Sequence, residues 1–319
     1  MKPPIAVVIP CYRVRAQVLA VLAGIGPEVA HIYAVDDACP EGSGDWIEQQ
    51  VRDPRVRVLR HAHNQGVGAA VMTGYAAALA DGAEVVVKLD GDGQMDPALI
   101  RRFVQPIVRG QADYTKGNRF YDLRHIRRMP ALRLVGNAGL SFMAKLSTGY
   151  WHLFDPTNGY TAIHARVARL VQRDEVSARY FFESDLLFRL NTLRAVVVDI
   201  PMSARYGDES SSLRVGRALG EFAWKHLRNL GKRLFYSYFL RDMTVASLEL
   251  LAGLALLGFG VVFGALQWSH ALQTGVLTPT GTVMLAALPT LLGLQLLLAF
   301  VAFDVANVPR RPIHLDLPD

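Results

Sequence analysis

Two aspartates separated by one glycine, Asp90 and Asp92, follow a short apolar run in the stretch VVVKLDGDGQMDP, residues 85–97. Side chains two positions apart in an extended segment point the same way, and Gln94 lies two positions further on. Two carboxylates and an amide oxygen that converge on one point suit a hard divalent cation that also holds phosphate oxygens. Gly91 would leave room for a ligand. A solvated turn at the end of a strand could carry the same residues, so the rest of the chain decides between the two interpretations.

The apolar run before this turn is predicted to be a central parallel strand, because its β-branched residues suit a strand buried on both faces. Ligands of open α/β sheets bind outside the carboxyl ends of the strands, where the two aspartates would lie. Strand and helix patterns alternate around it, which predicts a parallel, doubly wound α/β sheet. Strands are predicted at 5–9, 29–35, 56–59, 85–89, 113–119 and 195–200, and helices at 14–23, 46–51, 69–80 and 136–147.

Composition limits the class of protein. The net charge of +6 and the pI of about 9.4 indicate an acidic partner, either a phosphate-bearing ligand or an anionic membrane face; we expect no nucleic acid partner. Cys11 and Cys39 do not suggest a disulfide framework or a zinc site and fit a reducing compartment. The start of the chain, MKPP followed by five apolar residues, is not expected to be a cleavable signal.

A glycine-rich loop at 64–74 (NQGVGAAVMTG) opens onto a helix of small residues. It is not a G-x-G-x-x-G motif after the first strand, and a P-loop is absent, so the sequence gives little support for a site that binds NAD or FAD. A nucleotide-binding half without a phosphate cradle leaves a metal ion to hold the phosphates.

Four motifs in this order resemble a family 2 glycosyltransferase of the GT-A fold. They are VVIPCY at 7–12, the pair Asp36-Asp37, NQGVGAA with TGY at 64–75, and DGDGQ at 90–94. The resemblance implies a Rossmann-like domain that binds a nucleotide sugar, with Mg²⁺ or Mn²⁺ held by Asp90, Asp92 and Gln94. It further implies a donor site that comprises Pro10, Tyr12, Val35, Asp37, Asp90, Gly91, Asp92, Arg119 and Arg205, in which the first four hold the base and ribose.

Two later segments resemble the dolichol-phosphate mannosyltransferase branch of that family. Residues 151–160 contain its D-P-x-x-G-[FY] pattern, and residues 181–190 resemble the segment that follows there. Asp155 and Asp185 are therefore candidate catalytic residues beside Asp90 and Asp92. In a helix Glu183 and Asp185 diverge, so we expect only one of them to face the site; both could instead form ordinary pairs with Arg179 or Arg189.

Arginines are the candidates for phosphate contacts, because guanidinium groups bind phosphate bidentately. Arg119 and Arg133 are predicted to bind phosphate, Arg133 on the acceptor side. The basic cluster at 123–133 could equally be a solvated face or face membrane headgroups. The segment at 202–213 resembles the branch's R-x-x-G-x-S-K pattern, but serines replace its lysine, so Arg205 is expected to take the lysine's place on the donor diphosphate.

The C-terminal third is predicted to lie on and in a membrane. Residues 213–241 form a basic amphipathic pattern typical of a helix on a membrane surface. Residues 245–266 contain one charge, Glu249, and residues 283–303 contain none. Each stretch can cross a hydrocarbon core of about 30 Å. Pro289 is expected to kink the second span, and Glu249 and Gln295, as polar groups in apolar spans, suggest a homo-oligomer or, for Glu249, an interfacial position.

Basic residues flank both spans on the outside of the pair, and the loop at 267–280 has no lysine or arginine. The positive-inside rule then places the catalytic domain and the tail in the cytoplasm, as a multi-pass protein of the cytoplasmic (inner) membrane. The predicted domains are a GT-A domain at 1–212, a juxtamembrane segment at 213–243, a two-helix anchor at 244–304 and a cytoplasmic tail at 305–319.

The resemblance implies inverting, metal-dependent transfer of a sugar from a UDP- or GDP-linked donor to a polyprenyl phosphate, giving a polyprenyl-monophosphate sugar. A second hypothesis is transfer to another lipid or a polysaccharide, although a Q-x-x-R-W motif is absent and two spans are few for an export channel. A third is a noncatalytic scaffold that binds nucleotide sugars; retention of Asp90, Asp92, Arg119 and Arg205 favours an enzyme.

Overall fold

The computed structural model describes residues 3–121, 131–171, 175–203 and 215–318 of the chain, without the side chains of 131–135, 137 and 215–219. The chain forms two compact units, Met1–Leu230 with Pro309–Asp319, and Gly231–Val308. These limits differ from the predicted domain boundaries at 212, 243 and 304. A division into compact units does not test those boundaries, so they stay predictions.

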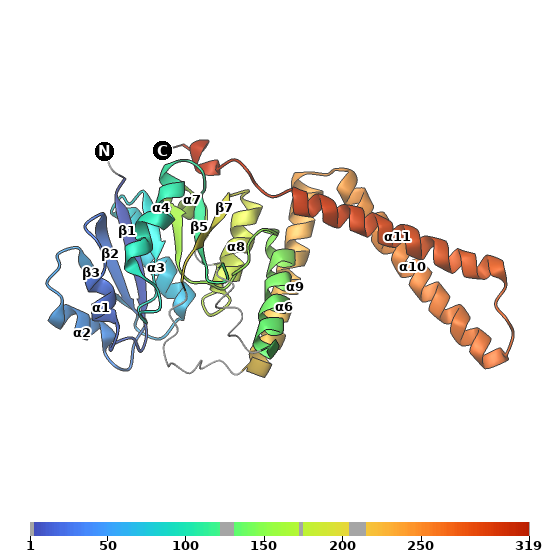
Figure 1. Cartoon of the computed structure of the whole chain (residues 1–319), viewed down its shortest axis with the longest axis horizontal. Coiled ribbons are helices and arrows are strands. Elements are labelled where there is room, and N and C mark those ends of the chain that lie inside the picture. Colours follow the sequence, from blue (N-terminus) through green and yellow to red (C-terminus); the bar gives the residue numbers. More distant parts are fainter. Residues whose placement is uncertain (1–2, 122–130, 172–174, 204–214, 319) are drawn as a thin grey trace. The chain divides into compact units, whose positions relative to one another are not determined.

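A seven-stranded sheet forms the centre of the first unit within the described residues, with the order β3-β2-β1-β4-β6-β5-β7 (Figure 1). Six of these strands lie where the sequence predicted strands, with ends that differ by one or two residues. They are β1 (Ile5–Cys11), β2 (Val29–Asp36), β3 (Val56–Arg60), β4 (Val85–Lys88), β5 (Tyr114–Asn118) and β7 (Val197–Pro201).

The prediction of an all-parallel sheet was wrong at one strand. β6 (Thr161–His164) was not predicted, and it runs antiparallel to both of its neighbours, β4 and β5. All four of its residues are buried, so it lacks the alternation that identifies a half-buried strand, and so short a run cannot be told from a helix segment by pattern. Because β6 is antiparallel, it begins where β4 and β5 end.

Helices cover both faces of the sheet (Figure 1), which explains the nearly continuous apolar strands. α1 (Val18–Ala23) and α4 (Ile100–Val108) contribute to one apolar core with Val7 and Ile9. α3 (Val67–Ala80) packs on the opposite face, where a Cβ on Gly74 would collide with Val8. The glycine thus allows the predicted close packing. The other elements of this unit are α2 (Ser43–Gln50), η1 (Pro97–Leu99), α6 (Ala131–Thr148), α7 (Ala165–Leu170) and α8 (Phe182–Thr192).

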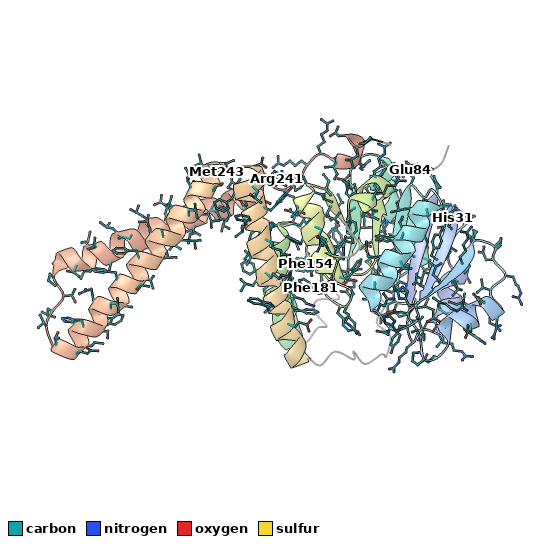
Figure 2. The ribbon with its side chains drawn as sticks, turned by 180° about the vertical axis from the view of Figure 1, so that it is seen from behind. His31, Glu84, Phe154, Phe181, Arg241 and Met243 are labelled. Atoms are coloured by element: carbon teal, nitrogen blue, oxygen red, sulfur yellow. The ribbon has the colours of Figure 1, made fainter. Side chains whose placement is uncertain are left out.

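The predicted basic amphipathic helix is present as α9 (Val215–Phe235), followed by the π-helical segment η3 (Tyr236–Arg241). Phe181, labelled in Figure 2, contacts the ring of His226 edge-on at 4.8 Å between centroids. His226 also hydrogen-bonds the Ser147 hydroxyl at 2.7 Å. The polar His226 side chain of α9 is therefore buried against Ser147 and Phe181. The exposed side chains of α9 include the apolar Trp224, Leu227 and Phe235.

The second unit contains two long apolar helices, α10 (Val245–Thr274) and α11 (Thr280–Ala306), each long and apolar enough to cross a membrane. They pack closely through small residues, as membrane helices do: a Cβ on Gly260 would lie 2.7 Å from the Ala286 carbonyl oxygen. α11 continues through Pro289 without a break. Gln295 is exposed and Glu249 is half-buried in this single chain, and the homo-oligomer stays a prediction.

A buried ion pair joins the start of this unit to the end of α11. The Arg233 guanidinium donates to both carboxylate oxygens of Asp304, at 2.6 and 2.9 Å, and the Tyr238 hydroxyl donates to the same carboxylate at 2.6 Å. Both charged side chains are about 95% shielded from solvent. The segment before the first apolar helix is thus fixed to the end of the second.

The tail after α11 returns to the first unit. In η4 (Ile313–Leu315), the main-chain N–H groups of Ile313 and His314 donate to the Asp113 carboxylate at 3.0 and 2.9 Å. The His314 ring hydrogen-bonds the same carboxylate at 2.7 Å and stacks on His164 at 4.1 Å. The predicted cytoplasmic tail is therefore packed on the sheet domain.

Candidate active site

The site lies at the end of the sheet where strands β4 and β5 end and strand β6 begins. Thr161, the first residue of β6, is in register with Lys88 of β4 on one side and Lys116 of β5 on the other. The loop that precedes β6 contains Asp155 and must reach Thr161 at this same end. The antiparallel strand therefore brings the loop at 149–160 to the acidic turn at 90–94.

The acidic turn holds Asp90, Asp92 and Gln94, and all three are half-buried. The Gln94 main-chain N–H donates to the Asp92 carboxylate at 2.9 Å, and the Asp90 N–H donates to the Met95 sulfur at 3.3 Å. A Cβ on Gly91 would lie 3.1 Å from a methyl of Val14, so the missing side chain allows close packing against the core. That Gly91 also leaves room for a ligand stays a prediction.

Lys88 is a buried cation that the sequence analysis did not identify. Its ammonium nitrogen lies 2.8 Å from Asp90 Oδ1 and 3.2 Å from Glu183 Oε1, and its side chain is 2% exposed. Burial by itself lowers the pKa of a lysine, but the two carboxylates outweigh it and raise the pKa of Lys88. The lysine therefore stays protonated and neutralises part of the acidic turn.

The acidic turn fits a hard divalent cation by the chemistry of its donors. Two carboxylates and an amide oxygen leave the remaining positions of such an ion for water and phosphate oxygens, which is how Mg²⁺ is usually held. In the part of the chain that the structure describes, no group of three or more His, Cys, Asp or Glu side chains is placed to hold a metal ion by itself. The turn thus suits a cation shared with a ligand rather than a structural ion.

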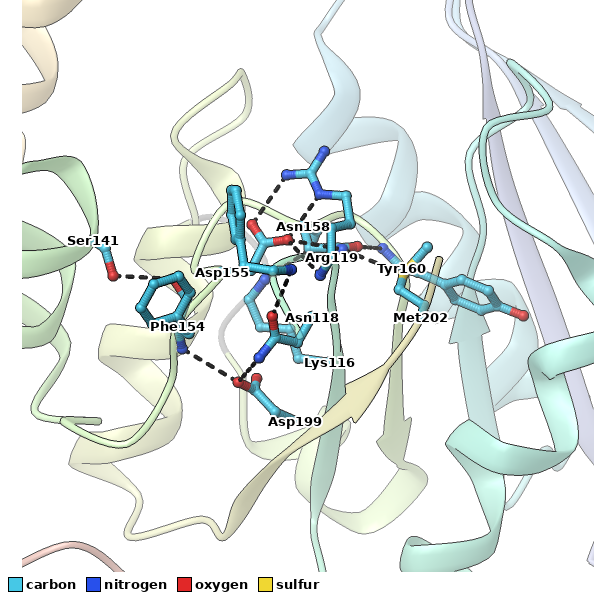
Figure 3. Close-up of polar contacts among 11 residues, drawn as sticks. Lys116, Asn118, Arg119, Ser141, Phe154, Asp155, Asn158, Tyr160, Asp199 and Met202 are labelled. Carbon is cyan, nitrogen blue, oxygen red and sulfur yellow. Dashed lines mark hydrogen bonds and ion pairs between the residues drawn. The ribbon is translucent and has the colours of Figure 1, made fainter. Parts of the chain in front are cut away.

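Arg119 and Asp155, both predicted site residues, form an ion pair in which only the acid is fully buried (Figure 3). The Arg119 guanidinium donates to both oxygens of Asp155, at 2.8 and 3.0 Å, and its main-chain N–H donates at 3.2 Å. Burial raises the pKa of Asp155, but the Arg119 hydrogen bonds and the Lys116 charge hold it below its usual value. Asp155 is 1% exposed and Arg119 is 32% exposed, so Asp155 fixes a guanidinium that reaches the surface.

A second polar group surrounds Lys116 of β5. Its ammonium donates to the Asn158 carbonyl at 2.9 Å. Burial lowers the pKa of Lys116 to about 8, although Asp155, Glu183 and Asp199 act in the opposite direction. The Asp199 carboxylate accepts from the Asn118 amide at 3.1 Å and from the main chain of the loop before β6 at 3.2 Å (Figure 3). These contacts connect β5, β7 and the loop.

The predicted donor residues lie at the ends of β1 and β2. Asp37 is buried, and its carboxylate accepts from the main-chain N–H groups of Gln65 and Gly66 at 2.8 and 2.7 Å and contacts the His61 ring at 2.7 Å. It thereby fixes the glycine-rich loop. Gly66 has φ +101°, and a Cβ there would lie 2.5 Å from the Ala178 carbonyl, so this position requires glycine.

The other predicted donor contacts differ in exposure. Tyr12 is 42% exposed and Pro10 is half-buried, whereas the Val35 side chain is fully buried. Val35 is buried as a whole residue, so its predicted contact with the base or ribose stays a prediction. Arg205 lies outside the described residues. The backbone of Arg133 belongs to α6, but its side chain is not described.

Of the two acids of α8, Glu183 lies near the acidic turn: its carboxylate is 3.2 Å from the Lys88 ammonium, which itself contacts Asp90. The Asp185 carboxylate accepts from the Ser177 main chain and the Asn229 amide, each at 2.9 Å, and pairs with Arg189 at 3.3 Å. These contacts are the ordinary pairing that the sequence left open. The catalytic role predicted for Asp185 stays a prediction.

The sequence analysis missed Lys88, Asn158 and Asp199. A lysine as the last residue of an otherwise apolar buried strand was a visible signal for the first, since buried charges are paired. No comparable signal marked the other two: Asn158 lies in a loop and Asp199 lies within the edge strand β7, where such residues are common.

Comparison with known proteins assigns the chain. The family model "Glycosyl transferase family 2" matches residues 6–170, more than half of the chain. The undecaprenyl-phosphate mannosyltransferase of Micrococcus luteus is 29% identical over 192 residues, which cover 60% of this chain and 78% of that protein. The polyprenol monophosphomannose synthase of Mycolicibacterium smegmatis is 30% identical over 203 residues, 62% of this chain and 76% of that one.

Among solved structures, glucosyl-3-phosphoglycerate synthase from Mycobacterium tuberculosis in complex with Mn²⁺, uridine diphosphate and glucosyl-3-phosphoglycerate superposes with a TM-score of 0.55. It is 17% identical and the match covers 72% of this chain and 80% of that chain. At this identity the likeness shows the shared GT-A fold, including the mixed sheet. With the motifs and the family match, it leads to one assignment: this chain is a glycosyltransferase and belongs to glycosyl transferase family 2.

Proposed function

We propose that the protein catalyses inverting, metal-dependent transfer of a sugar from a nucleotide sugar to a polyprenyl phosphate. The single observation that carries this proposal is the pairing of two sites at one end of the sheet. The acidic turn with Asp90 and Asp92 lies after β4, and the Arg119–Asp155 pair lies after β5. One site suits the leaving diphosphate and the other an anionic acceptor.

The relatives support this substrate class. Two are named for transfer of mannose to undecaprenyl phosphate or polyprenol phosphate, and a third, from Methanococcus voltae, is named for transfer of N-acetylglucosamine from a UDP-linked donor to dolichyl phosphate. Phosphorylated polyprenols are common to all three, whereas the sugar differs. We therefore assign the acceptor class and leave mannose, N-acetylglucosamine and other sugars to experiment.

The donor half would bind the nucleotide along the ends of β1 and β2. Pro10, Tyr12, Val35 and Asp37 are the proposed contacts to base and ribose, and Asp37 also orders the glycine-rich loop. Asp90, Asp92 and Gln94 would hold Mg²⁺ or Mn²⁺, a role supported by the Mn²⁺ and Mg²⁺ complexes of structural neighbours. When bound, the cation supplies positive charge that stabilises the departing diphosphate.

The acceptor phosphate is anionic at neutral pH, so its attack needs positioning more than a general base. A phosphate oxygen forms the new bond to the anomeric carbon from the face opposite the leaving group, while the bond to the nucleoside diphosphate breaks and takes its electron pair. No proton has to move. Arg119, held by Asp155, and Arg133 are the proposed phosphate ligands, and Arg205 is the proposed contact to the diphosphate.

The two apolar helices are proposed as a multi-pass anchor in the cytoplasmic membrane, with the catalytic domain in the cytoplasm. Their length and hydropathy support spanning, and the arginines outside the pair support this orientation. The exposed Trp224 and Leu227 of the basic helix α9 suit a membrane surface. The anchor would bring the domain to a lipid substrate that does not leave the bilayer.

A radiolabel transfer assay tests the proposal. Purified full-length protein is incubated with undecaprenyl phosphate, Mn²⁺ or Mg²⁺, and labelled UDP- and GDP-sugars, with and without EDTA. We expect a chloroform-soluble, mild-acid-labile product from one donor and its loss with EDTA; the anomeric configuration of the product reports inversion. Donor binding or hydrolysis without any lipid product would contradict the acceptor assignment and favour another acceptor or a scaffold.

A further inference from the structure

Three charged side chains from two parts of the chain form one cluster around a buried lysine at the acidic turn. Lys88 ends β4, Asp90 follows two residues later, and Glu183 lies in the first turn of α8, 95 residues beyond Lys88. The exposed fractions of the side chains are 2% for Lys88, 12% for Glu183 and 27% for Asp90. The two acids therefore share one lysine ammonium group that has almost no contact with water.

The backbone of Gly159 closes this cluster. A Cβ at that position would collide with the Lys88 ammonium and would lie 2.6 Å from Asp90 Oδ2. Lys88 thus has no room to swing away from Asp90 on this side. The lysine contacts Oδ1 of Asp90 and so holds the carboxylate in one orientation. The second carboxylate oxygen, Oδ2, lies beside Gly159.

The charges give the cluster a specific balance. Lys88 alone would cancel the charge of Asp90 and weaken any cation site that uses it, because a like charge nearby opposes binding. Glu183 offsets this effect by providing a second acid for the same lysine. The turn then keeps the net negative charge of two carboxylates while Asp90 remains fixed.

We propose that Glu183 is a positioning residue that acts through Lys88, balancing the lysine's charge so that Asp90 is oriented by Lys88 yet still binds a divalent cation. The inference rests on the proposed function, since it requires a cation at Asp90 and Asp92. It adds two residues, on β4 and α8, that would set the affinity of that site without touching the cation.

The test measures Mn²⁺ binding alone, by the electron paramagnetic resonance signal of free Mn²⁺, on full-length protein in detergent. Glu183→Gln keeps the shape but removes the balancing charge, so we expect Mn²⁺ affinity to fall about tenfold, or about 1.4 kcal/mol. Glu183→Asp retains the charge and should recover most of the affinity. The matched control is Glu175→Gln, which removes the same charge from an acid that is 60% exposed and pairs with Arg189; it should change affinity less than twofold.

The double variant Lys88→Met with Glu183→Gln gives the sharpest outcome. It removes both opposing charges, so we expect Mn²⁺ affinity within about threefold of the wild type, clearly tighter than for Glu183→Gln alone. A residue that only stabilises the fold would instead lower the melting temperature and leave Mn²⁺ affinity unchanged.

Wild-type affinity in Glu183→Gln, or a double variant no better than that single variant, would overturn the inference while leaving the transferase proposal intact. Absence of Mn²⁺ binding in the wild type would overturn the inference too, and the loss would then lie in the proposed cation site. Lipid product in the transfer assay, with or without EDTA, separates that case from failure of the proposed reaction.

Discussion

Two buried lysines at neighbouring strand ends have opposite pKa shifts. Lys88 of β4 and Lys116 of β5 lie on either side of Thr161 in register, and both are almost fully buried. Lys88 has two carboxylates within 3.2 Å and a raised pKa. Lys116 donates to a carbonyl, and its pKa falls to about 8. Burial alone therefore does not decide the charge of a lysine; a carboxylate within hydrogen-bonding distance does.

The same contrast separates the proposed tasks of the two strand ends. At the end of β4, the Asp90 and Glu183 carboxylates lie near the Lys88 ammonium. With Asp92 in the same turn, the net charge is negative and suits a metal ion. The β5 end directs a guanidinium outward from a buried acid, which suits a phosphate.

The largest effect is expected at the acidic turn. Asp92→Asn should lower transfer by a factor on the order of 10²–10³ or more, because the cation that stabilises the leaving diphosphate loses a charged ligand. The residue is half-buried in a turn, so the melting temperature should stay within a few degrees. Wild-type turnover in a radiolabel assay would disprove the metal assignment.

At the β5 end, Asp155→Asn should destabilise the protein by about 2–3 kcal/mol, at or just below the range of about 3–5 kcal/mol for breaking a fully buried ion pair, because Arg119 is one third exposed. Thermal unfolding of the detergent-purified protein checks this. Asp316→Asn, which removes an acid from the exposed Arg311–Asp316 pair, is the control and should cost less than about 0.5 kcal/mol.

The pH dependence of this pair has a definite sign. The folded pKa of Asp155 is lowered, so its contribution to stability is complete above the unfolded pKa of about 4 and is lost as pH falls through the folded value. The stability difference between wild type and Asp155→Asn should therefore shrink below pH 4. A difference that stays constant down to pH 3 would contradict the lowered pKa.

Gly159→Ala tests the backbone that closes the lysine cluster. The added methyl would collide with Lys88 and would also lie 2.6 Å from Asp90 Oδ2. It would therefore displace the Asp90 carboxylate itself, and we expect about tenfold weaker Mn²⁺ binding, equivalent to about 1.4 kcal/mol. Gly82→Ala is not a suitable control, because Gly82 has φ +78°. Gly139→Ala is, because an added Cβ there meets no neighbouring atom within 4 Å. Equal Mn²⁺ affinity in the two variants would show that the cluster tolerates displacement.

The smallest effect concerns the lysine of β5. Between pH 8 and its ordinary pKa of 10.5, Lys116 is protonated in the unfolded chain but not in the folded one, so wild-type stability should rise with pH. Relative to the wild type, Lys116→Met should lose about 3 °C in melting temperature from pH 8 to pH 10. Lys88→Met should show no such trend, since the raised pKa of Lys88 keeps it protonated in both states below 10.5. Parallel curves for wild type and Lys116→Met would contradict the contrast.

Much of this protein could be predicted from local sequence. Buried strands such as β1 and β4 are recognisable because their residues are β-branched and continuous, and the acidic turn follows from its position after a strand. The two apolar helices need only length and hydropathy. The family followed from four motifs in order, and the comparisons confirmed it.

What local sequence could not supply was the partner of each charge. Lys88 and Glu183 are 95 positions apart, and Arg119 and Asp155 are 36 apart. The direction of β6 decides the Arg119–Asp155 pairing, because an antiparallel strand returns the Asp155 loop to the end of the sheet where β4 and β5 end. Its four buried residues carry no pattern that specifies direction.

The sequence by itself therefore determined the chemistry available to this protein: carboxylates after a strand, arginines for phosphate and two apolar helices. Tertiary structure decided which acid each of these groups contacts. Glu183 pairs with Lys88, Asp155 pairs with Arg119, and Asp185 contacts Arg189 and Asn229. The physical reason is that hydrophobic periodicity is a local property, whereas a buried charge is stabilised by whichever opposite charge the fold brings within about 3 Å.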